Sequence, residues 1–216
     1  MEYTIENDQL AVTVSTHGAE LVSAVNKADG AEMIWNADPR VWPRHAPILF
    51  PYVGKLKDGK YQLDGNTYTG GGHGFARDSE FTAIEVSEDR LSFCLTWNEE
   101  TLKKFPRKFR LTVSFTLEGR TLRQQAEVTN LDDKEMRFGL GYHPDSEFPL
   151  MTGMKPRITS CGSTLPSIRR KYCMKEPLFP TTPGPMPSRA LLSLSMTAFL
   201  TMTPSALKTW MPKLSA

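Results

Sequence analysis

The sequence predicts an all-β protein whose strands form an antiparallel sandwich or barrel, and two observations lead to this prediction. As far as residue 142, short runs of alternating apolar and polar residues follow one another, with turn residues between them. Helical periodicity is nearly absent from the same region. Many short strands at close spacing are typical of antiparallel sandwiches and barrels.

Five runs have the alternation and the β-branched or aromatic content of strands, and we expect strands at Leu10–Val14, Phe81–Val86, Leu91–Trp97, Phe109–Leu117 and Thr121–Thr129. Pairs of an acidic residue and a glycine predict hairpin turns at residues 29–30, 58–59, 64–65 and 118–119. The clearest hairpin is Tyr61–Tyr68, in which two short arms flank an Asp-Gly pair. One short helical turn is expected at Asn98–Lys104.

The composition changes near residue 150. Residues 1–150 hold 17 Lys and Arg against 23 Asp and Glu, whereas residues 151–216 hold nine basic residues and a single acid, Glu176. Five prolines between Pro177 and Pro187 exclude a central strand or helix interior there. We expect residues 1–150 to form the β-region and residues 151–216 to be a poorly ordered tail that does not pack against it. The apolar run Ala190–Leu194 fits a disordered tail poorly.

Several classes of protein are disfavoured by composition. No run of 18 apolar residues is present, and the N-terminal residues lack the basic and apolar pattern of a secretory signal, so a cytoplasmic protein is expected. Cys94, Cys161 and Cys173 match neither a metal motif nor a disulfide framework, and Cys94 is expected in the core. The basic residues of the tail are scattered with little aromatic interleaving, so neither a nucleic acid nor a membrane is expected as a partner.

Three clusters contain the residue types that could carry chemistry. Residues 42–57 are dense in aromatics, prolines and cations, including Lys55. In residues 70–78, glycines before His73 permit close approach to a ligand, and Arg77 adds a cationic fork. In residues 138–144, an expected strand ends on His143. From spacing alone, a structural alternative stays open for each cluster. His73 could be a solvated loop residue, and His143-Pro144 could simply end a strand. Arg77 and Asp78 could form a surface ion pair, and Lys55 could be solvated.

Five segments occur in the order seen in aldose 1-epimerases, namely Gly18–Ser23, Ile34–Pro39, Pro47–Gly54, His73–Arg77 and Gly139–Pro144. Over residues 1–144 the chain resembles this family, and most closely its LacX-like branch. The resemblance implies a large antiparallel β-sandwich with a sugar cleft on one sheet. It also implies interconversion of the α and β anomers of a hexose or hexose phosphate. This reaction needs only proton transfers, so neither a metal nor an organic cofactor is expected.

The resemblance also implies roles for individual residues. His143 matches the histidine that protonates the ring oxygen of the sugar, and His73 matches a second histidine that orients and polarises the same region. An imidazole titrates near neutral pH and therefore suits this chemistry. Arg77 matches a residue that contacts sugar hydroxyls. Lys55 is a further candidate for substrate binding, since a cation here would suit a phosphate.

The resemblance implies one residue that the chain lacks. In the family a late glutamate, typically in a Glu-Pro-Trp segment, removes the proton of the anomeric hydroxyl. The only late acid here, Glu176, is out of register and lacks the aromatic, so it is not assigned this role. Two functions therefore stay open: an aldose 1-epimerase-like isomerase, which would be inactive without this base, and a carbohydrate-binding protein without turnover.

The tail departs from the family directly after His143-Pro144. Read one base earlier, codons for Asp145–Glu147 can encode Gly-Phe-Arg, which restores the family's pattern. Methionine has a single codon, and a one-base shift turns it into His, Asp, Asn or Tyr. A methionine-rich tail without aspartate is what an acidic loop region would become. We therefore hypothesise a frameshift near codons 144–145, with a genuine lineage-specific tail as the alternative.

Overall fold

The computed structural model describes residues 1–145 and, as backbone, residues 189–195. The described residues form an all-β fold of antiparallel strands with a single short α-helix, as the sequence predicts. In chain order the strands are β1 (Glu2–Glu6), β2 (Leu10–Ser15), β3 (Glu20–Asn26), β4 (Ala31–Glu32), β5 (Ile48–Leu49), β6 (Lys60–Leu63), β7 (Asn66–Thr69), β8 (Thr82–Val86), β9 (Arg90–Thr96), β10 (Phe109–Glu118), β11 (Thr121–Asn130), β12 (Gly141–Tyr142) and β13 (Arg189–Ser195). The helical segments are η1 (Lys57–Gly59), η2 (Ala76–Asp78) and α1 (Glu99–Lys104).

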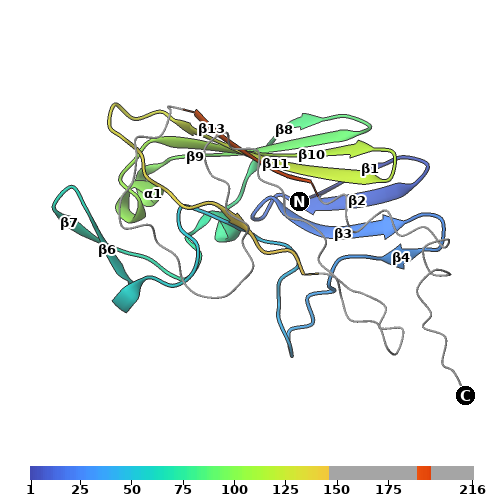
Figure 1. Cartoon of the computed structure of the whole chain (residues 1–216), viewed down its shortest axis with the longest axis horizontal. Helices are drawn as coiled ribbons and strands as arrows, with labels where there is room; N and C mark the ends of the chain where they lie inside the picture. Colours follow the sequence, from blue (N-terminus) through green and yellow to red (C-terminus); the bar gives the residue numbers. More distant parts are fainter. Residues whose placement is uncertain (146–188, 196–216) are drawn as a thin grey trace, which may run out of the picture.

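Two sheets form the layers of the sandwich (Figure 1). The first has the strand order β1-β2-β3-β4, and the second has the order β13-β11-β10-β9-β8. Buried apolar side chains from both sheets belong to one hydrophobic cluster. Tyr3 of the first sheet meets Phe93 of the second with ring centroids 5.8 Å apart. The predicted sandwich is thus confirmed.

Alternation along the strands explains why one face of each sheet is buried. In β2 every second side chain is buried, from Leu10 through Val12 to Val14. In β10 the same period buries Phe109, Leu111, Val113, Phe115 and Leu117. Because successive side chains of a strand point to opposite faces, this period places the apolar set between the sheets.

β5 and β12 form a two-stranded sheet of their own, next to the buried residue Phe50. Leu49 pairs with Gly141, and Ile48 pairs with Tyr142. Phe50, directly after β5, is fully buried and contacts four other phenylalanine rings, those of Phe75, Phe105, Phe109 and Phe138. Residues adjoining β5 and β12 therefore rest on a rigid aromatic core.

The elements predicted from alternation are confirmed. Each of the five expected runs coincides within two residues with a strand, namely β2, β8, β9, β10 and β11. The Tyr61–Tyr68 hairpin is formed by β6 and β7, and the expected helical turn is α1. Asn98 begins α1, because its side chain accepts a hydrogen bond from the backbone N–H of Thr101 while the Thr101 hydroxyl bonds the Asn98 backbone.

Two local predictions are wrong. Asp58-Gly59 does not turn a hairpin, because it belongs to η1, a 3-10 turn that leads into β6. Cys94 does not join the core cluster, because its neighbours Phe93 and Leu95 face the core and the strand period turns Cys94 to the other side. The thiol is half-buried there, and burial raises its pKa. Cys161 and Cys173 lie outside the described residues.

The prediction that no part of the tail packs against the β-region is wrong for residues 189–195. This segment forms β13 and pairs antiparallel with β11, from Arg189 opposite Thr129 to Ser195 opposite Arg123. The physical reason is that β11 would otherwise present a row of unpaired backbone groups, and an extended segment satisfies them. The rest of the predicted tail lies outside the described residues.

Within the described part of the chain, no helix has the length and apolar character needed to cross a membrane.

Candidate active site

His73 sits in a backbone turn that its neighbours impose. Its φ of 67° lies in the left-handed region, as does the φ of 76° at Gly74. A Cβ at position 74 would lie 2.0 Å from the Phe50 carbonyl oxygen, so only glycine fits there. That carbonyl also accepts hydrogen bonds from the amides of Phe75 and Ala76 at 2.9 and 3.1 Å. The glycine-rich segment therefore fastens His73 to the end of β5.

The imidazole of His73 is held in one tautomer. The His73 backbone N–H donates to the Gly54 carbonyl at 2.8 Å, and the Gly54 N–H donates to His73 Nδ1 at 3.0 Å. Since Nδ1 accepts a hydrogen bond, the proton of the neutral ring lies on Nε2. Burial of the ring lowers the pKa of His73, and the positive charges of Arg77, His143 and Lys55 lower it further. His73 is thus a neutral Nε2–H donor near pH 7.

His143 is placed beside His73 by the short β12 strand. The His143 backbone N–H donates to the Pro47 carbonyl at 3.0 Å, which extends the β5–β12 pairing by one step. The imidazole centroids of His73 and His143 are 6.1 Å apart, with the rings inclined at 71°. Residues 70 positions apart in the sequence thus form one histidine pair.

Trp42 contacts His143. The sequence did not single out Trp42 as an individual candidate residue. Its ring centroid lies 4.8 Å from that of His143, with the planes tilted by 40°. The Trp35 indole N–H donates to the Trp42 carbonyl at 2.9 Å, and the Trp42 N–H donates to the Asp38 carbonyl at 2.9 Å. These bonds fix the backbone of the loop where it meets His143.

The loop between β4 and β5 is also fastened to the segment that follows His143. The Asp145 N–H donates to the His45 carbonyl at 3.0 Å, and the Trp35 N–H donates to the Asp145 carbonyl at 3.2 Å. His45 Nδ1–H donates to the Trp35 carbonyl at 2.6 Å. The loop and the His143 segment therefore form one hydrogen-bonded unit.

Glu20 is the buried anchor of this loop. Its side chain is only 6% exposed, and its Oε1 accepts the backbone N–H groups of His45 at 2.7 Å and Ala46 at 3.0 Å. Arg44 Nη1 lies 3.5 Å from the other carboxylate oxygen. A buried carboxylate with these partners is satisfied and fixes the chain that leads into β5.

A second arginine, Arg44, contacts the backbone of Arg77. Arg44 donates to the Arg77 carbonyl at 3.1 Å and forms an ion pair with Asp78. Arg77 Nε lies 3.6 Å from Asp78 and has no hydrogen-bond partner, although it is buried. The Arg-Asp ion pair considered from the sequence therefore exists, and the guanidinium also lies close enough to lower the pKa of His73.

The structure brings together all four residues singled out from the sequence. Arg77, His143 and Lys55 each act electrostatically on His73. Their roles in binding and proton transfer stay predictions. Glu20, Arg44, His45 and Trp42 join the site through contacts that no local pattern reveals. The sequence signals were that Trp42, Arg44 and His45 fall in the aromatic and cationic segment at residues 42–57 and that Glu20 falls in Gly18–Ser23, a segment that resembles the family.

The described residues supply a histidine pair with the positive charges of Arg77 and Lys55 acting on it. Among the charges of residues 1–145 that act on His73, none is a carboxylate. Glu176 lies outside the described residues. The described part also contains no group of three or more His, Cys, Asp or Glu side chains able to hold a metal ion.

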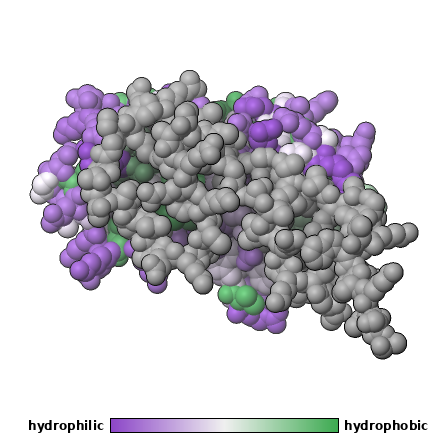
Figure 2. All heavy atoms as spheres, viewed as in Figure 1, coloured by the Kyte–Doolittle hydropathy of each residue, from purple (hydrophilic) through white to green (hydrophobic). Residues whose placement is uncertain are grey.

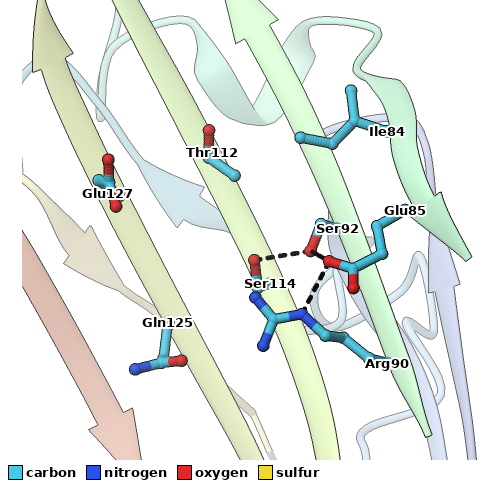
Figure 3. A pocket seen from close by; sticks show the side chains of 8 residues that line it. All are labelled: Ile84, Glu85, Arg90, Ser92, Thr112, Ser114, Gln125 and Glu127. Atoms are coloured by element: carbon cyan, nitrogen blue, oxygen red, sulfur yellow. Dashed lines mark hydrogen bonds and ion pairs between the residues drawn. The ribbon is translucent and has the colours of Figure 1, made fainter. Parts of the chain in front are cut away.

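Two hollows in the described surface are lined by residues other than the histidine pair. A groove of about 380 Å³ crosses the outer face of β8–β11 (Figure 3). Its floor is an internal network in which the Ser92 and Ser114 hydroxyls are 2.9 Å apart and Ser92 and Arg90 donate to the Glu85 carboxylate. A second groove, of about 500 Å³, lies between the first sheet and the loop that holds His45. Neither groove is lined by His73 or His143.

The fold agrees with what the comparisons with known proteins show. Residues 1–145 match the family model described as "Aldose 1-epimerase", and the chain belongs to this family. Members of the family bind sugars. The chain is 38% identical over 161 residues to the chromosomal protein LacX of Lactococcus lactis subsp. lactis, covering 72% of this chain and 54% of that protein. The chain thus spans about half the length of this relative.

Two solved structures extend the comparison to the fold. A galactose mutarotase related enzyme from Lactobacillus acidophilus is 41% identical with a TM-score of 0.69, covering 72% of this chain and 52% of that one. A galactose mutarotase-like protein from Lactobacillus casei ATCC 334 is 35% identical with a TM-score of 0.69, covering 90% of this chain and 68% of that one. The sandwich described above is therefore galactose mutarotase-like.

Proposed function

We propose that the chain binds a hexose or hexose phosphate at the histidine pair and carries the acid half of an aldose 1-epimerase reaction. The observation that carries this proposal is the 6.1 Å pairing of His73 and His143, with His73 locked as an Nε2–H donor. Family membership supports sugar as the ligand. Arg77 and Lys55 add positive charge beside the pair, which suits hydroxyl oxygens and, where present, a phosphate.

The reaction opens the sugar ring and closes it with the opposite configuration. The imidazolium of His143 gives its proton to the ring oxygen as the bond from that oxygen to the anomeric carbon breaks. The anomeric hydroxyl loses its proton to a base, and its oxygen becomes the carbonyl oxygen of the open sugar. Rotation about the adjacent carbon–carbon bond and reversal of both proton transfers give the other anomer. The Nε2–H of His73 orients the sugar by donating a hydrogen bond in the same region.

The base that takes the proton from the anomeric hydroxyl lies outside residues 1–145 in this proposal. The second candidate function follows from this: a chain without that base binds the sugar and does not turn it over.

The test separates binding from turnover. The side-chain NMR signals of His73 and His143 are followed while D-glucose, D-galactose and their 6-phosphates are added to the full chain. Anomer exchange is measured with the same sugars by magnetisation-transfer NMR. A His143→Asn variant is the control for both. Saturable shifts with accelerated exchange support the epimerase, and saturable shifts with exchange at the buffer rate support the binding protein. If no sugar moves either histidine signal, the proposal is wrong.

A further inference from the structure

We propose that Trp42 is the aromatic wall of this site and that it binds the C–H face of a pyranose ring. The inference rests on the proposed function and names the form of sugar that the site selects. Its starting observation is the 4.8 Å contact between the indole of Trp42 and the imidazole of His143. The indole therefore lies next to the group that would protonate the ring oxygen.

Hydrogen bonds fix the backbone that carries Trp42. Both backbone hydrogen-bonding groups of Trp42 are satisfied, the N–H by the Asp38 carbonyl and the carbonyl by the indole N–H of Trp35. Glu20 holds the end of the same loop through the amides of His45 and Ala46. An aromatic ring that is fixed before binding loses little conformational entropy when a ligand arrives.

Two exposed apolar side chains lie on the segments that carry Trp42 and contact β12. Trp42 itself is half-buried, while Val41 is 74% exposed and Val53, which packs against β12 near Gly141, is 43% exposed. Hydrophobic atoms are visible at the tip of the loop between β4 and β5 (Figure 2). Exposed apolar side chains beside polar functional groups are typical of a ligand-binding surface.

The polar side of the site is formed by different residues. His73 offers an Nε2–H, and Arg77 and Lys55 bring positive charge close to it. The site therefore combines one apolar aromatic surface with hydrogen-bond donors and cations. A pyranose has matching chemistry, because its ring presents a cluster of C–H groups on one face and hydroxyl oxygens around its edge.

This arrangement distinguishes a ring from an open chain. An alditol carries the same kind of hydroxyls as the corresponding aldose, but it has no rigid C–H face to lie on an indole. Trp42 is then a specificity-determining residue that favours pyranoses over alditols. An aromatic contact of this kind corresponds to about tenfold in affinity.

The experiment compares D-glucose with sorbitol and D-galactose with galactitol, using the full chain. Dissociation constants are measured from the NMR signals of His73 and His143 in the wild type, Trp42→Phe and Trp42→Ala. Trp97→Ala is the matched control. Trp97 directly follows β9 of the second sheet, and its ring centroid lies 4.9 Å from Lys108 Nζ. We expect Trp42→Ala to weaken pyranose binding about tenfold with little effect on alditols. Trp42→Phe should retain most of the preference, and Trp97→Ala should retain all of it.

The outcomes separate the two proposals. If the wild type binds pyranoses and alditols equally, or if Trp42→Ala weakens both classes to the same extent, the aromatic wall is wrong while sugar binding stands. If none of these ligands moves either histidine signal in the wild type, the proposed function itself is wrong. Near-UV circular dichroism of each variant shows whether the fold is retained, and Trp42→Phe supplies the answer if Trp42→Ala does not fold.

Discussion

The backbone N–H of Gly54 donates a hydrogen bond to Nδ1 of His73 at 3.0 Å, and the His73 N–H returns one to the Gly54 carbonyl at 2.8 Å. This reciprocal pair links two segments that the sequence separates by 19 positions. Protonation of Nδ1 would break the first of these bonds. The tautomer and the position of His73 therefore have a common origin in this reciprocal pair, whereas burial and the neighbouring positive charges lower its pKa.

The first prediction concerns stability against pH. Because the pKa of His73 is lowered in the folded protein, the unfolded chain binds this proton more readily. The contribution of His73 to stability is therefore complete above the unfolded pKa of about 6.5 and is lost as pH falls toward the folded pKa. We expect the free energy of unfolding to decrease between pH 7.5 and 5.5, as measured by urea denaturation.

His73→Asn is the variant that isolates this effect. Asparagine tolerates a positive φ, and its side-chain oxygen can accept the Gly54 N–H, but it does not titrate in this range. The variant should lose part of the decrease in stability on acidification. An unchanged pH dependence in His73→Asn would show that other groups cause the decrease.

The second prediction compares two glycines with almost the same backbone angle. Gly74 has φ 76° and Gly30 has φ 73°, but an added Cβ meets the Phe50 carbonyl oxygen at 2.0 Å in the first case and nothing within 4 Å in the second. Gly30→Ala should cost about 1–2 kcal/mol, from the backbone angle alone. Gly74→Ala should cost more than about 3 kcal/mol, because backbone must move. Urea denaturation of both variants checks this, and equal losses would rule out the steric explanation.

The sequence predicted the strands that depend on local alternation and missed the contacts that depend on the fold. β2, β10 and β11 are visible as alternating runs because their burial pattern follows the strand period. β5 and β12 have two residues each, which is too short for a period to appear. They exist because Phe50 and the Pro47 carbonyl meet partners more than 20 positions away.

Part of the candidate site could be predicted from the sequence, and part could not. His73, Arg77, His143 and Lys55 belong to segments that resemble a family, so their convergence could be expected. Trp42 and Glu20 could not be assigned, because an indole or a carboxylate has no local pattern that reveals a contact with a distant loop. Glu20 in particular resembles any charged residue at the start of a strand, although its side chain is only 6% exposed.

The third prediction concerns Glu20 as the anchor of the Trp42 loop. Glu20→Gln keeps an oxygen that can accept the N–H groups of His45 and Ala46, and it loses only the charge facing Arg44. Glu20→Ala leaves both amides without their partner, at about 1–3 kcal/mol for each buried group. We expect the free energy of unfolding to fall by more in Glu20→Ala than in Glu20→Gln. Similar losses in both variants would mean that charge, and not the two amide bonds, is what matters.

The final prediction concerns the reading frame behind the tail. Residues 1–145 match the family model, while the LacX relative extends well beyond the part that this chain covers. If a one-base shift near codons 144–145 produced the tail, resequencing the gene from codon 140 should reveal a second open frame. That frame should encode further family-like strands and a Glu-Pro-Trp-like segment. A protein expressed from the restored frame should then accelerate anomer exchange, with the new glutamate as the base. If stop codons block the shifted frame, the tail is a genuine part of the chain, and β13 is then the strand that this protein uses to cover the edge of β11.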